Sequence, residues 1–471
     1  MFKLSDFEKS LLTKGNLVET WARKLFPDGI LIDEAGANAL QATKQHITEK
    51  THVIFQPKFI YDKFLAKCDV LEYDKKDGCW NLYEIKGANS LDENAGNIDH
   101  VEDATFQTIV LKAAEIKVGK VFIIHLNREY VRGNEINVEE LFIKDDITAK
   151  VRDREENTKS KMQKATEALF QQEEKALVCQ CIYSGRSAHC ATFRYSYPEI
   201  PEYSIHDLSR IGSSKKKLEF LVDSQIFALN DIPEDFELTP KQKNQVYAHK
   251  KQNPLIDLIA IKQELRSLAY PLYFLDYETY PPAIPLFKGY KPYQQIPFQF
   301  SLHILKDEDN EPTHFEYLHT ELTDPSLSVI AKLREAIGPM GSIIVWSKRF
   351  ERGINSQLAE RCPEHRDFLD NINDRIYDLM DIFHKQFYVH PDFKGKTSIK
   401  KVLPVMAPEL TYAELEIKEG GSAMEAWYEM VFGVGSQADK SKIADDLRRY
   451  CGLDTYAMYA IWKKLMILAW Q

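Results

Sequence analysis

The feature that most constrains the fold of this chain is the apolar run YFLDYETY at residues 273–280, which carries Asp276 and Glu278. In a β-strand, side chains at positions i and i+2 point to the same face, so the two carboxylates converge on one place. Neighbouring acids repel each other, and a hard divalent cation is the simplest partner that would keep both ionised. The run therefore predicts a buried strand that supplies half of a metal site.

Two later segments add acids in an order that suits the same site. The apolar run GSIIVWSKRFE ends at Glu351, and RRYCGLDTYAMYAIW carries Tyr450 and Asp454 on a predicted amphipathic helix. One helical turn separates Tyr450 from Asp454, so both side chains face the same way. With 23 tyrosines in the chain, about one Tyr-x-x-x-Asp is expected by chance. The order and setting of the motifs therefore matter more than this spacing.

Together these residues resemble the DEDD superfamily of 3′–5′ exonucleases, in the subclass whose last motif is Tyr-x-x-x-Asp. The resemblance implies an RNase H-like fold and a catalytic set that binds Mg²⁺ or Mn²⁺ through its acids. The catalytic set would be Asp276, Glu278, Glu351, Tyr450 and Asp454, with the four acids as metal ligands. Carboxylate-held metal ions are suited to phosphodiester hydrolysis, and Tyr450 would orient the attacking water. One departure is Glu351, since the second motif usually carries Asp.

The N-terminal part, to about residue 150, reads as a mixed α/β unit with acids of its own. Apolar strands are expected at HVIFQPKFIY, AKCDVLEYD, WNLYEIKGA and KVFIIHLN, with a helix at EDATFQTIVLKAAEI. A hairpin across the turn KKDG would bring Asp69 against Glu84 and Lys86. An Asp, a Glu and a Lys around one point can bind Mg²⁺ and hold a water. A solvated strand face would explain Glu-x-Lys equally well.

With Gln107 on the following helix, this array resembles the PD-(D/E)XK nucleases of the RecB type over roughly residues 50–130. The resemblance implies a restriction-endonuclease-like fold, catalysis by Asp69, Glu84 and Lys86, metal binding by the two acids, and a substrate-side or supporting role for Gln107. Two positions depart from the pattern. Gln56 stands where related domains often carry Glu, and Leu111 stands where the motif continues with Tyr.

A charged helical segment and a cysteine-bearing segment follow the first unit. The segment CQCIYSGRSAHC holds three cysteines: Cys179, Cys181 and Cys190. RecB-type nucleases of this kind often carry cysteines for an iron–sulfur cluster, which takes four thiolates. Alternatively, His189 would complete a Zn²⁺ site, or Cys68 or Cys79 would join the three cysteines in space. Free buried cysteines are the remaining alternative.

The C-terminal part continues with strands at PFQFSLHIL, FEYLHT and SIIVWS and a helix at SLSVIAKLREAI, an order that suits an RNase H-like sheet. Asp378 is expected at a strand end, as a helper of the acids or as a helix cap. The aromatic, proline-rich stretch after residue 280 would either stack terminal bases or close a core.

Polar residues in this part are candidates for substrate contacts. Gln299, Ser301 and His303 alternate out of phase with apolar residues, so they occupy one strand face that is expected to look into the cleft. Lys396, Lys400 and Lys401 in GKTSIKKVLP would contact phosphates near the metals. A solvated face would explain these lysines as well.

Composition sets wider bounds. A length of 471 residues predicts two to four domains, and a net charge of −10 argues against a protein that coats nucleic acid non-specifically. The N-terminal residues lack a signal-peptide pattern and no run of eighteen apolar residues occurs, which predicts a cytoplasmic protein that does not bind membranes. Seven cysteines in such a chain argue against a disulfide framework.

The sequence thus predicts an α/β protein in three parts: a PD-(D/E)XK domain (1–150), a helical, cysteine-bearing connector (151–265) and an RNase H-like exonuclease domain (266–471). The predicted partner is nucleic acid, with DNA favoured over RNA because of the RecB-like part, and the predicted substrate is single-stranded or end-exposed DNA. Two alternatives remain open. One is an exoribonuclease with only its C-terminal site active, and the other is a scaffold without enzymatic activity.

Overall fold

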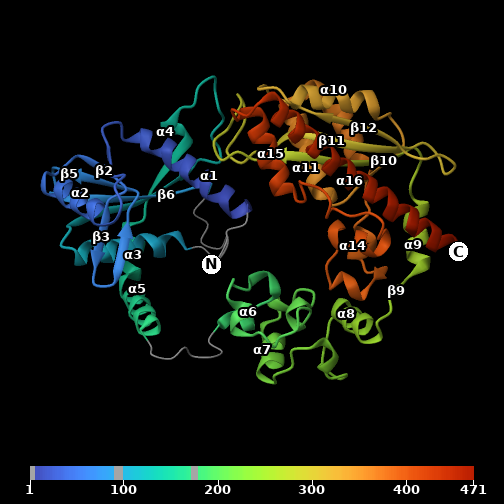
Figure 1. The fold of residues 1–471 in the computed structure, drawn as a ribbon, viewed down its shortest axis with the longest axis horizontal. Helices are drawn as coiled ribbons and strands as arrows, with labels where there is room; N and C mark the ends of the chain where they lie inside the picture. Colours follow the sequence, from blue (N-terminus) through green and yellow to red (C-terminus); the bar gives the residue numbers. More distant parts are fainter. Residues whose placement is uncertain (1–5, 90–98, 171–178) are drawn as a thin grey trace. The chain divides into compact units, whose positions relative to one another are not determined.

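The computed structural model describes residues 6–89, 99–170 and 179–471 (Figure 1). The chain divides into two compact units, and each combines helices with β-sheet, as expected for an α/β protein. The first unit comprises Met1–Glu173 and Pro281–Gln295, and the second comprises Glu174–Tyr280 and Ile296–Gln471. The chain therefore crosses from one unit to the other three times.

The first unit is built on a six-stranded sheet in the order β1-β2-β5-β6-β7-β8. Its strands are β1 (Ile30–Leu31), β2 (Val53–Phe55), β5 (Val70–Asp74), β6 (Cys79–Lys86), β7 (Val118–Leu126) and β8 (Phe142–Asp146). The expected hairpin is confirmed, since β5 and β6 are antiparallel neighbours. The expected helix is present as α3 (His100–Ala113), and it leads into β7, which pairs in parallel with β6. This order places the end of β6 beside α3.

Four further α-helices and a separate hairpin are found in the described part of the first unit. They are α1 (Asp6–Ala22), α2 (Gly36–Thr48), α4 (Val138–Leu141), α5 (Thr148–Leu169), β3 (Lys58–Tyr61) and β4 (Phe64–Lys67). The single strand expected at HVIFQPKFIY is wrong, because it divides into β2 and β3. Gln56 has a left-handed backbone (φ 58°) and Pro57 has no N–H to donate, so the ladder is interrupted there.

Residues 281–295 are tied to the first unit by Arg132. Its guanidinium donates to the carbonyls of Pro285 and Leu286 at 2.6 and 2.7 Å, and its backbone N–H donates to the carbonyl of Tyr290. Ala283 and Ile284 pack in a buried cluster of this unit, and Tyr290 is 1% exposed. This stretch therefore closes a core, and its buried aromatic ring is not available to stack on bases.

The second unit contains a five-stranded sheet in the order β12-β11-β10-β13-β14. The strands are β10 (Leu272–Tyr280), β11 (Ile296–Leu305), β12 (Thr313–Leu318), β13 (Ser342–Val345) and β14 (Ile376–Asp378). The first three in chain order pair antiparallel, and β13 and β14 add in parallel. The strands expected at YFLDYETY, PFQFSLHIL, FEYLHT and SIIVWS are thus confirmed.

Helices cover both faces of this sheet. On one face, Tyr273 and Leu275 of β10 pack with α10 (Ser326–Ala336), α11 (Lys348–Arg361) and α12 (Arg366–Asp374). On the other face, Leu272 and Phe274 pack with α9 (Leu258–Arg266), α14 (Ile399–Met406) and the long α16 (Gln437–Trp470). The alternation along β10 therefore sends Phe274 and the residues in phase with it, Asp276 and Glu278, toward α16. Helices α13 (Asp381–His384) and α15 (Gly420–Phe432) complete this part.

Residues 179–251 form a small helical region of the second unit, which we call the cysteine region. It contains α6 (Phe193–Ser196), α7 (Lys215–Asp223) and α8 (Pro240–Lys251) around a core of its own. Helix α8 begins with Thr239 as N-cap in a capping box and Pro240 in the first turn. A two-stranded ladder of β9 (Leu255–Ile256) and β15 (Tyr388–Val389) follows it.

Across the described ranges, no helix has both the length and the apolar character needed to cross a bilayer.

Candidate functional site

The end of β10 brings two acids under α16. Asp276 and Glu278 lie opposite Ser301 and Gln299 of β11, and the register shifts directly after Glu278. One ligand atom each from Asp276, Glu278 and Cys451 of α16 lies within 4.8 Å of the others. Glu278 is buried, whereas Asp276 remains partly exposed. The strand thus places two carboxylates side by side, and Asp276 is the one that is accessible to solvent.

Glu351 approaches this place from the first turn of α11. It is 2% exposed, and its Oε2 is buried with no hydrogen-bond partner among the described residues. Burial and the charge of Asp276 raise the pKa of Glu351 to about 9. Asp378 caps the same helix, since it accepts from the N–H groups of Ser347 (3.0 Å) and Lys348 (2.8 Å). Asp378 is thus both a strand-end acid and a helix cap that holds Glu351 in position.

Tyr450 and Asp454 come from the middle of α16 and are both buried. Burial raises the pKa of Asp454 to about 6, although a hydrogen bond from the Tyr412 hydroxyl (2.5 Å) and the charge of Lys400 oppose the rise. Burial and the neighbouring acids also raise the pKa of Tyr450, so its hydroxyl stays protonated and can donate. We call Asp276, Glu278, Glu351 and Asp454 the acid cluster.

The acid cluster holds more carboxyl groups than its surroundings can keep ionised. Burial and the charge of Asp454 raise the pKa of Asp276 far above its usual range, and burial and the other two acids do the same for Glu278. Lys400 is the cation that lowers the pKa of Glu278 and Asp454. Its Nζ donates to the carbonyl of Lys418 (2.6 Å) and lies over the rings of Tyr412 and Tyr450, 5.6 Å from each centroid. Oxygen ligands crowded in this way, one without a partner, suit Mg²⁺ or Mn²⁺.

The polar face of β11 fixes α16 to the sheet. Gln299 donates to the carbonyl of Leu447 (3.1 Å), while Ser301 and His303 share hydrogen bonds with the Thr455 hydroxyl at 2.7 and 2.8 Å. Burial lowers the pKa of His303 to about 3. These three residues therefore lie beneath a helix, and the expectation that they look into a cleft is wrong. We predicted that His303 contacts substrate, whereas its side chain bonds to Thr455 and helps to hold α16 on the sheet.

A second set of acids meets in the first unit, at the ends of β5 and β6. Asp69 accepts from the N–H of Ile85 (2.7 Å) and from the amide of Gln56 (3.0 Å), and the same amide donates to Glu19 of α1. Burial raises the pKa of Asp69 to about 6, against the hydrogen bond from Ile85. An acid from α1 thus stands next to Gln56, the position where a Glu was expected.

Glu84 and Lys86 are bonded to each other and to α3. Lys86 Nζ donates to Glu84 (2.7 Å) and to Asp103 (2.5 Å), and the amide of Gln107 donates to Glu84 (2.8 Å). Burial and the charge of Asp69 raise the pKa of Glu84 to about 8, while Lys86 opposes the rise. Gln107 is buried, so it supports Glu84 from behind. We call Asp69, Glu84 and Lys86 the acid–lysine set.

Four residues at these two places were not found by sequence reasoning. They are Glu19, Asp103, Tyr412 and Cys451. Asp103 lies one helical turn before Gln107, and Cys451 lies about one turn before Asp454, so helical spacing could have indicated both. Glu19 is far from Asp69 in the chain and Tyr412 lies outside the helices and strands, so neither carries a local signal.

The three cysteines of the cysteine region gather as predicted from their spacing. Their sulfur atoms lie within 4.8 Å of one another, with 3.4 Å between those of Cys179 and Cys190. Hydrogen bonds with Thr192 and the other cysteines lower the pKa of Cys190 to about 7. Three thiols in this arrangement suit a soft metal ion such as Zn²⁺, which also needs a fourth ligand.

None of the predicted fourth ligands, His189, Cys68 or Cys79, belongs to the group of three sulfur atoms. His189 stacks on Phe193 with centroids 3.6 Å apart and hydrogen-bonds through Nε2 to the carbonyl of Ser184, which leaves Nδ1 buried without a described partner. Cys68 lies beside the acid–lysine set, where burial and the charge of Glu84 raise its pKa. Cys79 also belongs to the first unit, in β6. Three thiolates of the four that an iron–sulfur cluster takes are therefore present together.

The lysines of GKTSIKKVLP separate in space. Lys400 lies at the acid cluster, whereas Lys396 and Lys401 line a cavity together with residues of the cysteine region. The predicted phosphate contacts near the acids are thus reduced to one lysine.

Comparison with known proteins identifies relatives without a described activity. A family described as a domain of unknown function, DUF2779, matches residues 273–398. The uncharacterized protein MG366 of Mycoplasma genitalium is 25% identical over 299 residues, which cover 59% of this chain and 42% of that protein. The uncharacterized protein UU173 of Ureaplasma parvum serovar 3 is 26% identical over 262 residues, which cover 50% of this chain and 37% of that protein. This chain thus matches less than half the length of these relatives, and no solved structure gives a significant match.

Proposed function

We propose that this chain is a metal-dependent nuclease that removes nucleotides from the 3′ end of single-stranded or end-exposed DNA. The observation that carries the proposal is the acid cluster, in which carboxylates from β10, α11 and α16 converge although they are far apart in the sequence. Burying such like charges is costly without a compensating cation. A site for divalent metal ions accounts for that arrangement.

The surroundings of the acid cluster support an RNase H-like assignment of the second unit. Its sheet has three antiparallel strands followed by two parallel ones, with helices on both faces. The acids lie at the end of the central strand β10, and Tyr450 and Asp454 come from the last helix of the chain. This order of strand acids and helical Tyr-x-x-x-Asp is the one on which the resemblance to DEDD exonucleases rests.

The residues present fit the metal ions that this class of reaction requires. Asp276, Glu278, Glu351 and Asp454 would hold Mg²⁺ or Mn²⁺, which when bound lowers the pKa of water and stabilises charge on the leaving oxygen. The protonated hydroxyl of Tyr450 can hydrogen-bond to the attacking water and orient it. Lys400, held over the two tyrosine rings, provides a positive charge for a phosphate of the strand.

The acid–lysine set supports a second nuclease site of PD-(D/E)XK type. Two acids and a lysine on paired strands, backed by Gln107 on the next helix, match the order of the RecB-type pattern. Glu19 adds an acid beside Gln56, which offsets the departure at that position. The preference for DNA over RNA depends on this resemblance.

A digestion experiment tests the proposal. Strands of DNA and of RNA labelled at the 5′ end are incubated with Mg²⁺ and wild-type protein, Asp276→Asn, Glu84→Gln or the remote control Asp370→Asn. We expect stepwise shortening from the 3′ end that Asp276→Asn lowers by about 10³-fold, since a lost metal ligand costs several kcal/mol in the transition state. Asp370→Asn should match wild type. Shortening from the 3′ end that survives in Asp276→Asn and is lost in Glu84→Gln would show that the acid–lysine set, and not the acid cluster, is the hydrolytic site.

The second candidate is an exoribonuclease in which only the acid cluster is active. It is favoured by one observation: Lys86 is bonded to both Glu84 and Asp103, and Gln107 occupies the other oxygen of Glu84, so this carboxylate already has partners without a metal. In the same experiment, RNA would then be shortened faster than DNA, and Glu84→Gln would leave the rate of shortening unchanged.

A further inference from the structure

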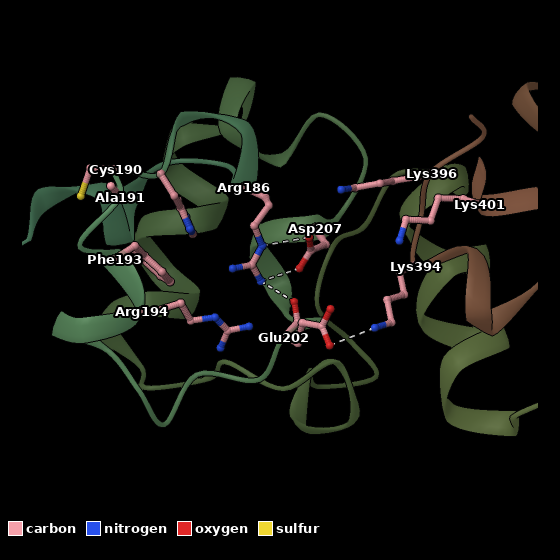
Figure 2. Close-up of a pocket in the computed structure, with 11 residues that line it drawn as sticks. Arg186, Cys190, Ala191, Phe193, Arg194, Glu202, Asp207, Lys394, Lys396 and Lys401 are labelled. Carbon is pink, nitrogen blue, oxygen red and sulfur yellow. Dashed lines mark hydrogen bonds and ion pairs between the residues drawn. The ribbon is translucent and has the colours of Figure 1, made fainter. Parts of the chain in front are cut away.

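A groove rich in basic residues lies in the second unit, between the cysteine region and the segment 394–401 (Figure 2). It consists of two adjoining cavities of about 270 and 740 Å³ that share Asp207 and three basic residues, Arg186, Lys394 and Lys396. We call it the basic groove. The acid cluster uses none of these three residues, so the groove is a separate feature of the same unit.

The charges of the basic groove are strongly unbalanced. The smaller cavity is lined by Arg186, Arg194, Lys394, Lys396 and Lys401, with Glu202 and Asp207 as its acids. The larger cavity adds Arg210 and Lys215 and no further acid. Seven basic residues thus face two acids in a protein whose net charge is −10. Such a local excess of one sign creates an attractive potential for anions.

Only part of this positive charge is neutralised. Arg186 binds Asp207 through two hydrogen bonds of 2.7 and 3.0 Å, and Lys394 pairs with Glu202 at 3.1 Å. Five other cations of the groove have no ion pair with any described acid: Arg194, Lys396, Lys401, Arg210 and Lys215. Figure 2 shows Lys396 and Lys401 on the wall opposite Arg186 and Arg194. The groove therefore has charged walls, and its exposed lysines Lys396 and Lys401 are available to a ligand on one of them.

A glycine fixes the lysines at the groove. Gly395 has a left-handed backbone (φ 73°), and a Cβ at this position would lie 3.1 Å from the carbonyl of Asp207 and would collide with the side chain of Gln245. Only glycine permits both the turn and this close approach. Lys394 and Lys396 flank Gly395, so the tight contact with the cysteine region holds both beside the groove.

Helix α14 links the basic groove to the acid cluster. Lys400 lies over the ring of Tyr450, beside the acids, whereas the next residue, Lys401, lines the groove. Consecutive residues on a helix point about 100° apart, so one turn of α14 presents a positive charge to each place. An anion long enough to pass over this turn would contact both.

We propose that the basic groove holds the phosphate backbone of the nucleic acid strand whose end is hydrolysed at the acid cluster, a few nucleotides from the cleaved bond. The inference rests on the proposed function. Lysines act as compact point charges that bind phosphates without reading bases, so the groove contributes affinity and positioning for any sequence. The repeated phosphates of a strand match a groove with several cations better than one small anion does.

Salt-dependent binding tests the proposal. A fluorescent 20-nucleotide strand is titrated with Asp276→Asn protein, with or without the added pair Lys396→Gln/Lys401→Gln. The control is the pair Lys440→Gln/Lys442→Gln at the start of α16, which removes the same charge away from the groove. For single strands the slope of log K against log salt changes by about 0.7 per phosphate contact, so the groove pair should reduce it by about 1.4 and the control pair by about 0. Equal slopes for the two pairs would overturn the proposal.

Substrate length separates the groove from the acid cluster. In otherwise wild-type protein, the groove pair should raise KM for the 20-nucleotide strand and leave the hydrolysis of a dinucleotide unchanged. If a dinucleotide, inorganic phosphate or an acidic peptide competes as well as the strand does, the groove is a general anion site and the strand proposal fails. If wild-type protein hydrolyses nothing while the groove pair still reduces the salt slope, the proposed function fails and the groove remains a strand-binding site.

Discussion

The two groups of acids differ in how their negative charge is compensated. In the first unit, Lys86 donates directly to Glu84 and Asp103, and the amides of Gln56 and Gln107 bind Asp69 and Glu84. In the second unit, Lys400 is the cation among the described residues that acts on the acid cluster, and its Nζ donates to a backbone carbonyl. The acid–lysine set is thus stabilised by its own side chains, whereas under the proposed function a bound metal ion compensates the acid cluster.

The largest expected effect concerns metal dependence. Removing divalent ions with a chelator should lower strand hydrolysis by about 10³-fold or more, because Lys400 alone among the described cations lowers the pKa of the clustered acids and the proposed reaction needs the metal-bound water. Isothermal titration of the stripped protein with Mn²⁺ should show binding that Asp276→Asn abolishes and Glu84→Gln reduces by at most one site. Binding that Glu84→Gln abolishes and Asp276→Asn leaves intact would reverse the comparison.

The next effect concerns the stability of the acid–lysine set. Lys86→Met leaves Glu84 and Asp103 without their cation, and breaking a buried ion pair costs about 3–5 kcal/mol. Hydrogen exchange of the peptide that spans β6 should therefore accelerate strongly. Adding Glu84→Gln should recover much of the protection, and Lys400→Met should leave it unchanged in this peptide. Equal protection in Lys86→Met and wild type would show that the lysine does not stabilise the set.

A smaller effect is expected at the hydroxyl of Tyr450. Tyr450→Phe keeps the buried ring and removes the hydroxyl that, under the proposed function, hydrogen-bonds to the attacking water. Such a bond is worth about 1.5–3 kcal/mol when a charged group is involved. The value of kcat should fall about 10- to 100-fold with little change in KM. The matched control is Tyr428→Phe on α15, where kcat should not change. A change in KM alone would assign Tyr450 to strand binding.

The smallest effect is the pH dependence of stability without metal. The pKa of Glu351 rises from 4.5 to about 9 on folding, so the stability it contributes is fully present below about pH 4.5 and is lost as the pH rises toward 9. The melting temperature in chelator should therefore fall on the order of a few °C between pH 6 and 9. Mg²⁺ should restore it, and Glu351→Gln should flatten the profile. A metal-free protein that is more stable at pH 9 would contradict this sign.

Local patterns were enough to place the strands and helices that carry the acids. The alternation in YFLDYETY and the spacing of Tyr450 and Asp454 predicted one strand and one helix, and both are present. What local patterns could not give is what covers a strand face. The alternation at Gln299, Ser301 and His303 was read correctly, but α16, which buries them, is distant in the chain. Glu19 and Tyr412 were missed for the same reason, because only tertiary packing brings them to the acids.

The domain boundaries also could not be predicted fully from local sequence patterns. Sequence reasoning assigned 266–471 to one domain, whereas residues 281–295 group with the first unit through Arg132 and a buried cluster. Prolines and aromatic residues there indicated a rigid loop. They did not indicate which core the loop completes.

Because residues 281–295 belong to the first unit, the two units cannot be separated by a single cut in the chain. Cutting the backbone between Glu173 and Glu174 would not yield two complete halves, because the shorter fragment would lack a piece of its own interior, still attached to the longer one. Each half, expressed alone, would expose apolar side chains or carry an orphaned loop. Separate expression of residues 1–173 and 174–471 is therefore expected to give insoluble products. The chain is best produced and studied whole.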